Sequence, residues 1–179
     1  MKKIMFSDKF GLTEAVLSGR KTMTRWICPD GTPLGNWAET VKKSRYQVGE
    51  VVAVAQAYRE IAHPDEFLDE RYEVKDEFVS GWANKLFVRA DLMPHQIRIT
   101  NVRVEKLQDI GDVDCLAEGI EFSHKSQSFY VKNDYTTGTQ TWLGNTPREA
   151  YAALTDRIFG KGMWQSNPYV FVYEFELIK

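Results

Sequence analysis

The chain has only two cysteines, Cys28 and Cys115, and they lie far apart in its 179 residues. The spacing of these two thiols does not match that of zinc ligands, which argues against a zinc site. We expect both thiols to be reduced. The three histidines show no metal-ligand spacing either. The sequence therefore predicts no metal ion and no cofactor.

Long apolar runs are also absent. No segment approaches the length of a membrane span, and Met1-Lys2-Lys3 leads into too few apolar residues for a secretory signal. We expect a cytoplasmic protein with no membrane partner.

Neither sign of charge dominates. The 23 Lys and Arg residues nearly balance the 25 Asp and Glu residues, which leaves a net charge of -2. This balance argues against a protein that holds nucleic acid by bulk charge, but it permits a local basic patch. With 43% hydrophobic and 27% charged residues, the composition is typical of a globular protein. The length predicts one domain over residues 1–179.

Hydrophobic periodicity predicts short helices between strands. Helices are expected over 12–17, 112–118 with Asp112 as N-cap, and 146–159 with Thr146 as N-cap; strands are expected over 51–55, 86–88, 96–107 and 169–177. A phase break near Thr100-Asn101 indicates a bulge.

The remaining segments are polar. Residues 29–45 are expected to form a loop, 64–81 a surface excursion, and 123–145 a loop or mobile hairpin. Strands at uneven spacing with short helices between them predict an α+β fold with a mixed, mostly antiparallel sheet. Closure into a small β-barrel would remove exposed strand edges.

The stretch Gly19-Arg20-Lys21-Thr22-Met23-Thr24-Arg25-Trp26 predicts a helix-to-strand corner. Such a corner can aim the Lys21 amine and the Thr24 hydroxyl into the same space. An amine beside a hydroxyl is the smallest pair of groups that can form an activated nucleophile, because the amine can take the proton of the hydroxyl. The residues alone leave two plain alternatives open: Thr24 as an ordinary strand residue and Lys21 as a solvated lysine at a helix end.

Gly19-x-Lys21-x-x-Thr24 after a short helix resembles the signature of the ASCH domain, a relative of the PUA fold. Three further segments resemble that family in the same order: 46–51, 104–120 with its Glu118-Gly119 ending, and 164–170. Together they span the chain apart from excursions at about 59–84 and 121–145. The variety is similar to one common in phages and bacterial genomes.

The resemblance implies a PUA-like β-barrel with a cleft for a nucleotide or nucleoside, in a superfamily whose members mostly bind RNA. One bacterial branch hydrolyses the acetyl amide of acetylcytidine with a lysine, a threonine and a glutamate. Lys21, Thr24 and Glu118 match these positions. By this resemblance Thr24 is the nucleophile, Lys21 the base and Glu118 the acid/base for the leaving amine.

The family motif continues to an arginine two residues after the threonine, where this chain has Trp26. Trp26 offers a stacking surface for a base. Arg25 is adjacent, but neighbouring strand residues face opposite sides, so alternation predicts that Arg25 does not replace that arginine. The other predicted nucleic-acid contacts are Arg20, Arg25, Arg98 and Asn167. An ordinary solvated face is the alternative for the basic residues on the long strand.

Three functions follow as hypotheses. The leading one is recognition of RNA or a modified nucleoside in a cleft lined by Lys21, Thr24 and Glu118. The second is hydrolysis of an acylated pyrimidine nucleoside by the same three residues. The third is a protein-interaction module, suggested by Trp142 in the polar segment 123–145.

Overall fold

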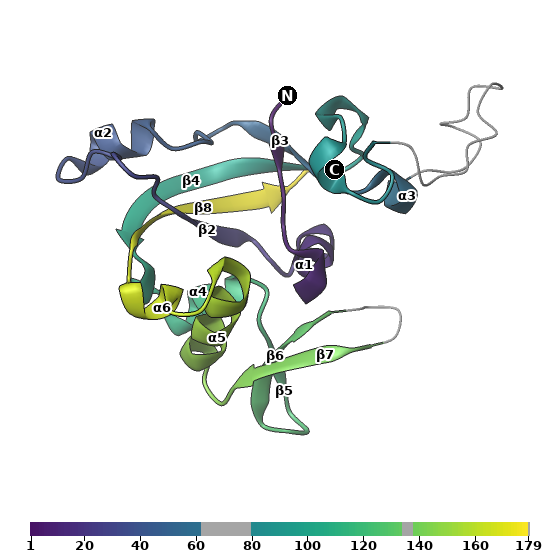
Figure 1. Ribbon diagram of the computed structural model, residues 1–179, viewed down its shortest axis with the longest axis vertical. Helices are drawn as coiled ribbons and strands as arrows, with labels where there is room; N and C mark the ends of the chain where they lie inside the picture. Colours follow the sequence, from purple (N-terminus) through teal and green to yellow (C-terminus); the bar gives the residue numbers. More distant parts are fainter. Residues whose placement is uncertain (62–79, 134–137, 179) are drawn as a thin grey trace.

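Two sheets and a group of short helices make up the fold in a computed structural model of the chain, which describes residues 1–61, 80–133 and 138–178 (Figure 1). The larger sheet has five strands in the order β1-β3-β4-β8-β2, and the smaller has three in the order β5-β6-β7. In Figure 1 the helices α4, α5 and α6 lie below the larger sheet and beside the smaller one.

The strands are β1 (Lys3–Ile4), β2 (Met23–Ile27), β3 (Val51–Val54), β4 (Gln96–Lys106), β5 (Glu121–Ser123), β6 (Ser128–Lys132), β7 (Gln140–Gly144) and β8 (Tyr169–Leu177). The α-helices are α1 (Leu12–Leu17), α2 (Trp37–Lys42), α3 (Tyr58–Ile61), α4 (Asp112–Ala117), α5 (Pro147–Phe159) and α6 (Met163–Ser166). Short 3-10 helices cover Asp8–Phe10, Lys85–Phe87, Ala90–Leu92 and Leu107–Asp109.

The core of the larger sheet is built on β4 and β8, which pair antiparallel along most of their length. Phe171, Tyr173 and Phe175 alternate along β8, and all three are buried. Their period of two places large side chains on one face. The register shift between Ile99 and Asn101 is the bulge that the sequence predicts.

The smaller sheet packs against α5, the longest helix. Thr146 caps this helix by accepting a hydrogen bond from the Glu149 N–H, and Pro147 occupies its first turn. A Cβ at Gly144 would lie only 2.8 Å from the Cβ of Glu149, so the end of β7 meets the helix where only glycine fits. This contact holds the smaller sheet beside α5.

The predicted α+β class is confirmed. The predicted mixed, mostly antiparallel sheet is confirmed as well, because β1 and β3 form the one parallel pair among the described strands and all other pairs are antiparallel. The predicted closed barrel is not seen in the described ranges. The larger sheet is open there, with β1 and β2 as its two edges. The edge position of β2 leaves room for a cavity beside it.

Two local predictions were wrong, and a third was right in part. Residues 86–88 form no strand, because the Asn84 side chain accepts from the Leu86 N–H and turns the backbone into the 3-10 helix Lys85–Phe87. Segment 29–45 contains α2, capped by Asn36. In segment 123–145 the predicted hairpin is formed by β6 and β7, but it belongs to the three-stranded sheet, where Val131 is fully buried. Most of the predicted excursion at 64–81 lies outside the described residues.

The helices of residues 1–61, 80–133 and 138–178 include none that is long and apolar enough to cross a membrane. Both cysteines are free thiols; Cys115 is buried on α4, and Cys28 is partly exposed.

Candidate functional site

The helix-to-strand corner forms as the sequence predicts. Gly19 ends α1 in the left-handed region at φ 73°, a conformation that favours glycine. The Lys21 N–H donates to the Ala15 carbonyl, and the Thr22 N–H donates to the Ala117 carbonyl at the end of α4. The corner is therefore tied to the helix end that carries Glu118.

The Lys21 ammonium is buried at this junction, with 2% of its surface exposed. Its Nζ donates to Oε2 of Glu118 at 2.5 Å, to the Glu118 carbonyl at 2.9 Å and to the Met23 carbonyl at 2.7 Å. Three acceptors match the three protons of an ammonium group. Burial lowers the pKa of Lys21, and the Glu118 carboxylate opposes that shift.

Arg25 lies on β2 and is also buried, with 2% of its surface exposed. Its Nη1 donates to Oε1 of Glu118 at 3.0 Å. Its Nη2 donates to Glu105 at 2.7 Å and to Asp114 at 2.8 Å. Burial alone would lower the pKa of Arg25, but Glu118 and the other acidic groups around it raise that pKa above the ordinary range.

Glu118 thus accepts from Lys21 on one oxygen and from Arg25 on the other. We call Lys21, Arg25 and Glu118 the inner cluster. Taking one partner away from such a group leaves an uncompensated buried charge, which is strongly destabilising. The inner cluster joins the corner, β2 and the end of α4 at one point.

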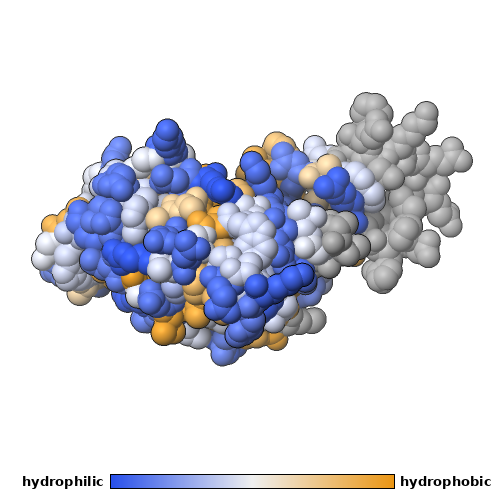
Figure 2. Space-filling model, turned by 90° about the horizontal axis from the view of Figure 1, so that it is seen from below, coloured by the Kyte–Doolittle hydropathy of each residue, from blue (hydrophilic) through white to orange (hydrophobic). Residues whose placement is uncertain are grey.

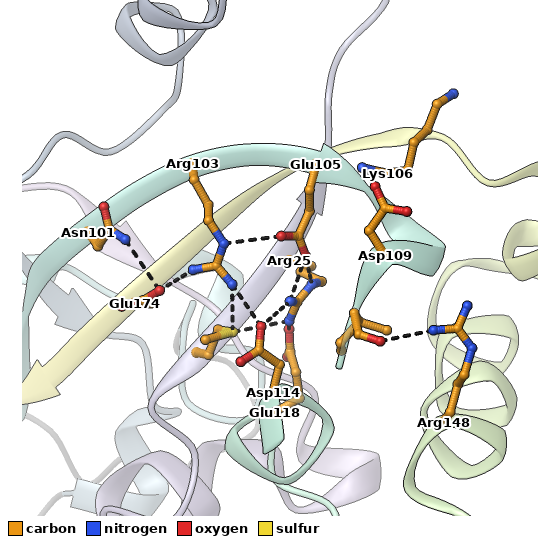
Figure 3. Close-up of polar contacts among 12 residues, drawn as sticks. Arg25, Asn101, Arg103, Glu105, Lys106, Asp109, Asp114, Glu118, Arg148 and Glu174 are labelled. Atoms are coloured by element: carbon orange, nitrogen blue, oxygen red, sulfur yellow. Dashed lines mark hydrogen bonds and ion pairs between the residues drawn. The ribbon is translucent and has the colours of Figure 1, made fainter. Parts of the chain in front are cut away.

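A chain of ion pairs leads outward from the inner cluster, as Figure 3 shows. Arg103 on β4 contacts Glu105 and Asp114, the two acids that Arg25 also contacts. Arg103 also contacts Glu174 on β8. The sequence suggested an ordinary solvated face for Arg103; instead this side chain connects the inner cluster to the sheet surface.

A cavity of about 400 Å³ lies against the inner cluster. Its polar lining comes from Lys21, Thr24, Arg25, Glu118, Tyr151, Thr155 and Ser7. Its apolar lining comes from Met5, Phe6, Leu12, Trp26, Ile27, Leu154, Ile158 and Phe159. Apolar walls with a few converging polar groups are typical of small-molecule sites, and the volume is within the usual range of about 300–1,000 Å³.

The three predicted catalytic residues, together with Arg25 and Trp26, line this one cavity. Alternation predicted that Arg25 would point away from Trp26, yet both reach the same space. Met23 and Arg25 share the face of β2 that meets α4, and the Sδ of Met23 accepts from the arginine at 3.1 Å. Because β2 is an edge strand, residues of both its faces can border a cavity beside it.

The other predicted contacts lie elsewhere. Arg20 pairs with Glu121 on the smaller sheet, and Arg98 pairs with Glu176 on the larger sheet. Asn167 lies in the turn before β8 at φ 45°, where its side-chain oxygen accepts from the Gln108 N–H. None of these three is among the residues that line the cavity.

The cavity residues that sequence reasoning missed include Tyr151 and Thr155 on α5. Both are buried. The sequence could have indicated that these two residues lie together, because positions four apart on a predicted helix share one face. That face brings two residues with hydroxyl groups to the lining of the cavity.

Trp142, which suggested a protein partner, lies on β7 with 47% of its surface exposed, against Tyr130 of β6. Figure 2 views the molecule from the side of the smaller sheet and shows hydrophobic residues in small groups between hydrophilic ones. A protein partner at Trp142 stays a prediction.

Comparisons with known proteins give little further direction. No protein-family model and no curated protein match the chain. The crystal structure of protein EF3133 from Enterococcus faecalis V583, described with the family DUF984, is similar over 99% of this chain and 77% of that chain, with 12% identity and a TM-score of 0.47. The ASCH and PUA-like resemblance therefore stays a prediction, and the functional argument depends on the cavity.

Proposed function

We propose that this chain binds a nucleoside-sized ligand, with a modified pyrimidine nucleoside as the leading class, in the cavity beside β2. One observation carries the proposal. Four residues of the corner and β2, Lys21, Thr24, Arg25 and Trp26, line a single cavity of about 400 Å³ together with Glu118, which lies 97 positions from Lys21 in the sequence. The apolar walls suit a planar base, and the polar groups offer hydrogen bonds to its edge.

The charge arrangement favours a free nucleoside over a polynucleotide. Arg20 and Arg98 are each engaged by a carboxylate, and Arg25 is buried among three. Phosphate contacts normally supply most of the affinity for a nucleic-acid strand. With a net charge of -2 and its candidate arginines paired, the chain is better suited to a ligand without a phosphate backbone.

Calorimetric titration with cytidine, uridine, N4-acetylcytidine and a short single-stranded RNA, repeated over a salt series, tests this proposal. We expect a nucleoside to bind with little salt dependence, because its contacts involve no counterion release. Binding of RNA with a steep salt dependence and no binding of any nucleoside would contradict it. So would an absence of all binding at low salt.

Tryptophan fluorescence supplies a matched control. We expect Trp26→Phe to lose most of the ligand-induced change, because this side chain lines the cavity. Trp142→Phe removes an exposed indole on β7 and should leave that change intact.

Hydrolysis of an acylated nucleoside is a second candidate, favoured by the position of Thr24. Its hydroxyl has no hydrogen-bond partner among the described residues, and Thr24 borders the cavity beside Lys21. In this reaction the Thr24 Oγ forms a bond to the amide carbon and gives up its proton. The C–N bond breaks, the amine takes up a proton and leaves, and water then releases the acyl group as a carboxylic acid.

The environment of Lys21 sets a condition on this chemistry. A base must be neutral, but the Nζ donates to three acceptors as a charged ammonium would. Burial lowers the pKa of Lys21 toward the neutral form. Turnover therefore requires Lys21 to give up one of these three hydrogen bonds.

Incubation with N4-acetylcytidine, followed by chromatography for cytidine, tests the second candidate. Thr24→Ala should abolish release of cytidine, and Thr24→Ser, which keeps a hydroxyl, should retain part of it. Activity that survives Thr24→Ala would exclude this threonine as the nucleophile. Binding without release of cytidine would leave the first proposal standing and exclude the second.

A further inference from the structure

Helix α5 contributes two buried side chains with hydroxyl groups to the lining of the cavity. Tyr151 and Thr155 lie one helical turn apart, with 4% and 1% of their surfaces exposed, and both line the cavity. Neither belongs to the lysine, threonine and glutamate set on which the second candidate function depends.

The Thr155 hydroxyl has no hydrogen-bond partner within residues 1–61, 80–133 and 138–178. It lies near the Tyr151 hydroxyl but does not meet the geometry of a hydrogen bond with it. A buried hydroxyl without a partner destabilises a protein, and almost all such groups are paired in native structures. A ligand atom in the cavity would supply the missing partner.

Tyr151 is a hydrogen-bond donor at this position. Burial, together with the nearby Glu118 carboxylate, raises the pKa of Tyr151 well above its usual value, so the phenol keeps its proton. Glu118 is the complementary acceptor. Its two oxygens accept from Lys21 and Arg25, and each oxygen has a second lone pair available. A donor, Tyr151, therefore lies near an acceptor, Glu118, in the lining of the cavity.

We propose that Tyr151 and Thr155 determine specificity by donating hydrogen bonds to a carbonyl oxygen of the ligand, while Glu118 accepts from the adjacent N–H. The ligand edge that fits is a neutral amide, O=C–N–H. This inference rests on the proposed nucleoside site and narrows its ligand class. A ring lactam and an acylated amino group both carry such an edge.

Four ligands test the edge by calorimetry. Uridine and N4-acetylcytidine have a carbonyl next to an N–H; 3-methyluridine carries a methyl group in place of that N–H, and cytidine has no N–H beside its ring carbonyl. We expect the first two to bind at least about tenfold more tightly than the second two, the loss typical of a buried group left unpaired. Equal binding of uridine and 3-methyluridine would overturn the amide edge.

Three variants test the two residues. Thr155→Val removes the hydroxyl with little change of shape, and we expect about tenfold weaker binding of uridine. Thr155→Ser keeps the hydroxyl and should bind uridine about as tightly as the native protein. Tyr151→Phe should weaken binding to a similar extent as Thr155→Val.

A purely structural role predicts a different pattern. Because Thr155→Val removes an unpaired buried hydroxyl, we expect its resistance to urea to be equal to or greater than that of the native protein. Weaker binding at undiminished stability would support the proposal. Unchanged uridine affinity in both Thr155→Val and Tyr151→Phe would overturn it while leaving the nucleoside site intact. If the native protein binds none of the nucleosides, the proposed function itself fails.

Discussion

Two sets of ion pairs in this molecule use the same chemistry in different surroundings. The inner cluster of Lys21, Arg25 and Glu118 is buried beside the cavity, with side-chain exposures of 1–5%. The outer pairs, which we define as Arg98–Glu176 and Lys42–Glu39, have side-chain exposures of 49–68%. The distances overlap, at 2.5–3.0 Å inside and 2.6–3.2 Å outside.

Burial, not distance, separates the two sets. Exposed pairs compete with water and salt and contribute only about 0–1 kcal/mol. Buried charges lose their hydration, so their partners must replace it completely. The inner cluster therefore fixes where three side chains lie, and this is the property that a ligand site requires. The following predictions test that difference.

The largest effect is expected when the shared carboxylate is removed. Glu118→Gln leaves Lys21 and Arg25 buried without their common anion and should lower the free energy of unfolding by about 3–5 kcal/mol. The matched variant Glu176→Gln breaks an outer pair and should change it by less than about 1 kcal/mol. Urea denaturation measures both. Equal losses would show that burial does not distinguish the two sets.

A smaller effect is expected when charge is kept and geometry is changed. Arg25→Lys cannot donate to Glu118, Glu105 and Asp114 together, because an ammonium lacks the planar fork of a guanidinium. We expect a loss of about 2 kcal/mol, since hydrogen bonds to charged groups contribute about 1.5–3 kcal/mol each. Arg98→Lys should have almost no effect. A harmless Arg25→Lys in thermal and urea unfolding would contradict the importance of the bridging geometry.

The smallest effect concerns the thiol beside the inner cluster. Burial raises the pKa of Cys115 from its ordinary value of 9.0 to about 12. The stabilisation from this shift is fully present below pH 9 and is lost as the pH rises toward 12, because the unfolded thiol ionises first. Between pH 9 and pH 10 the loss should be about 1 kcal/mol.

Comparison of Cys115→Ala with the native protein over this pH range isolates that loss. The variant should lose less stability per pH unit. Cys28→Ala, which changes the partly exposed thiol outside the cavity, serves as the matched control and should follow the native slope more closely. Parallel slopes for Cys115→Ala and the native protein would contradict the prediction.

Local patterns were enough to predict β3, β4, β8, α1, α4 and α5. The period-two aromatics of β8, the capping residues before α5 and the glycine after α1 all act over a few residues, where sequence carries the signal. Sheet closure could not be predicted in this way. Whether β1 and β2 meet depends on the twist and stagger of the whole sheet, which no short segment encodes.

The site shows the same limit. Lys21, Thr24 and Glu118 were grouped by resemblance, since nothing in their spacing links positions 21 and 118. Alternation placed Arg25 and Trp26 on opposite faces of β2 but could not predict that both would border one cavity, because it describes how a side chain leaves the strand and not how far a long guanidinium reaches. Thr155 was missed because an unpaired hydroxyl becomes visible only when every neighbour is in place.

The order of strands in the larger sheet has a consequence for biosynthesis. Within the described part of the chain, β2 pairs only with β8, so Met23 lies opposite Glu174. During translation, Thr24, Arg25 and Trp26 thus leave the ribosome long before their strand partner exists. Until β8 emerges, β2 is an unpaired strand that can join the wrong neighbour. The segment that contributes most to the site is therefore the one that a nascent chain must protect longest.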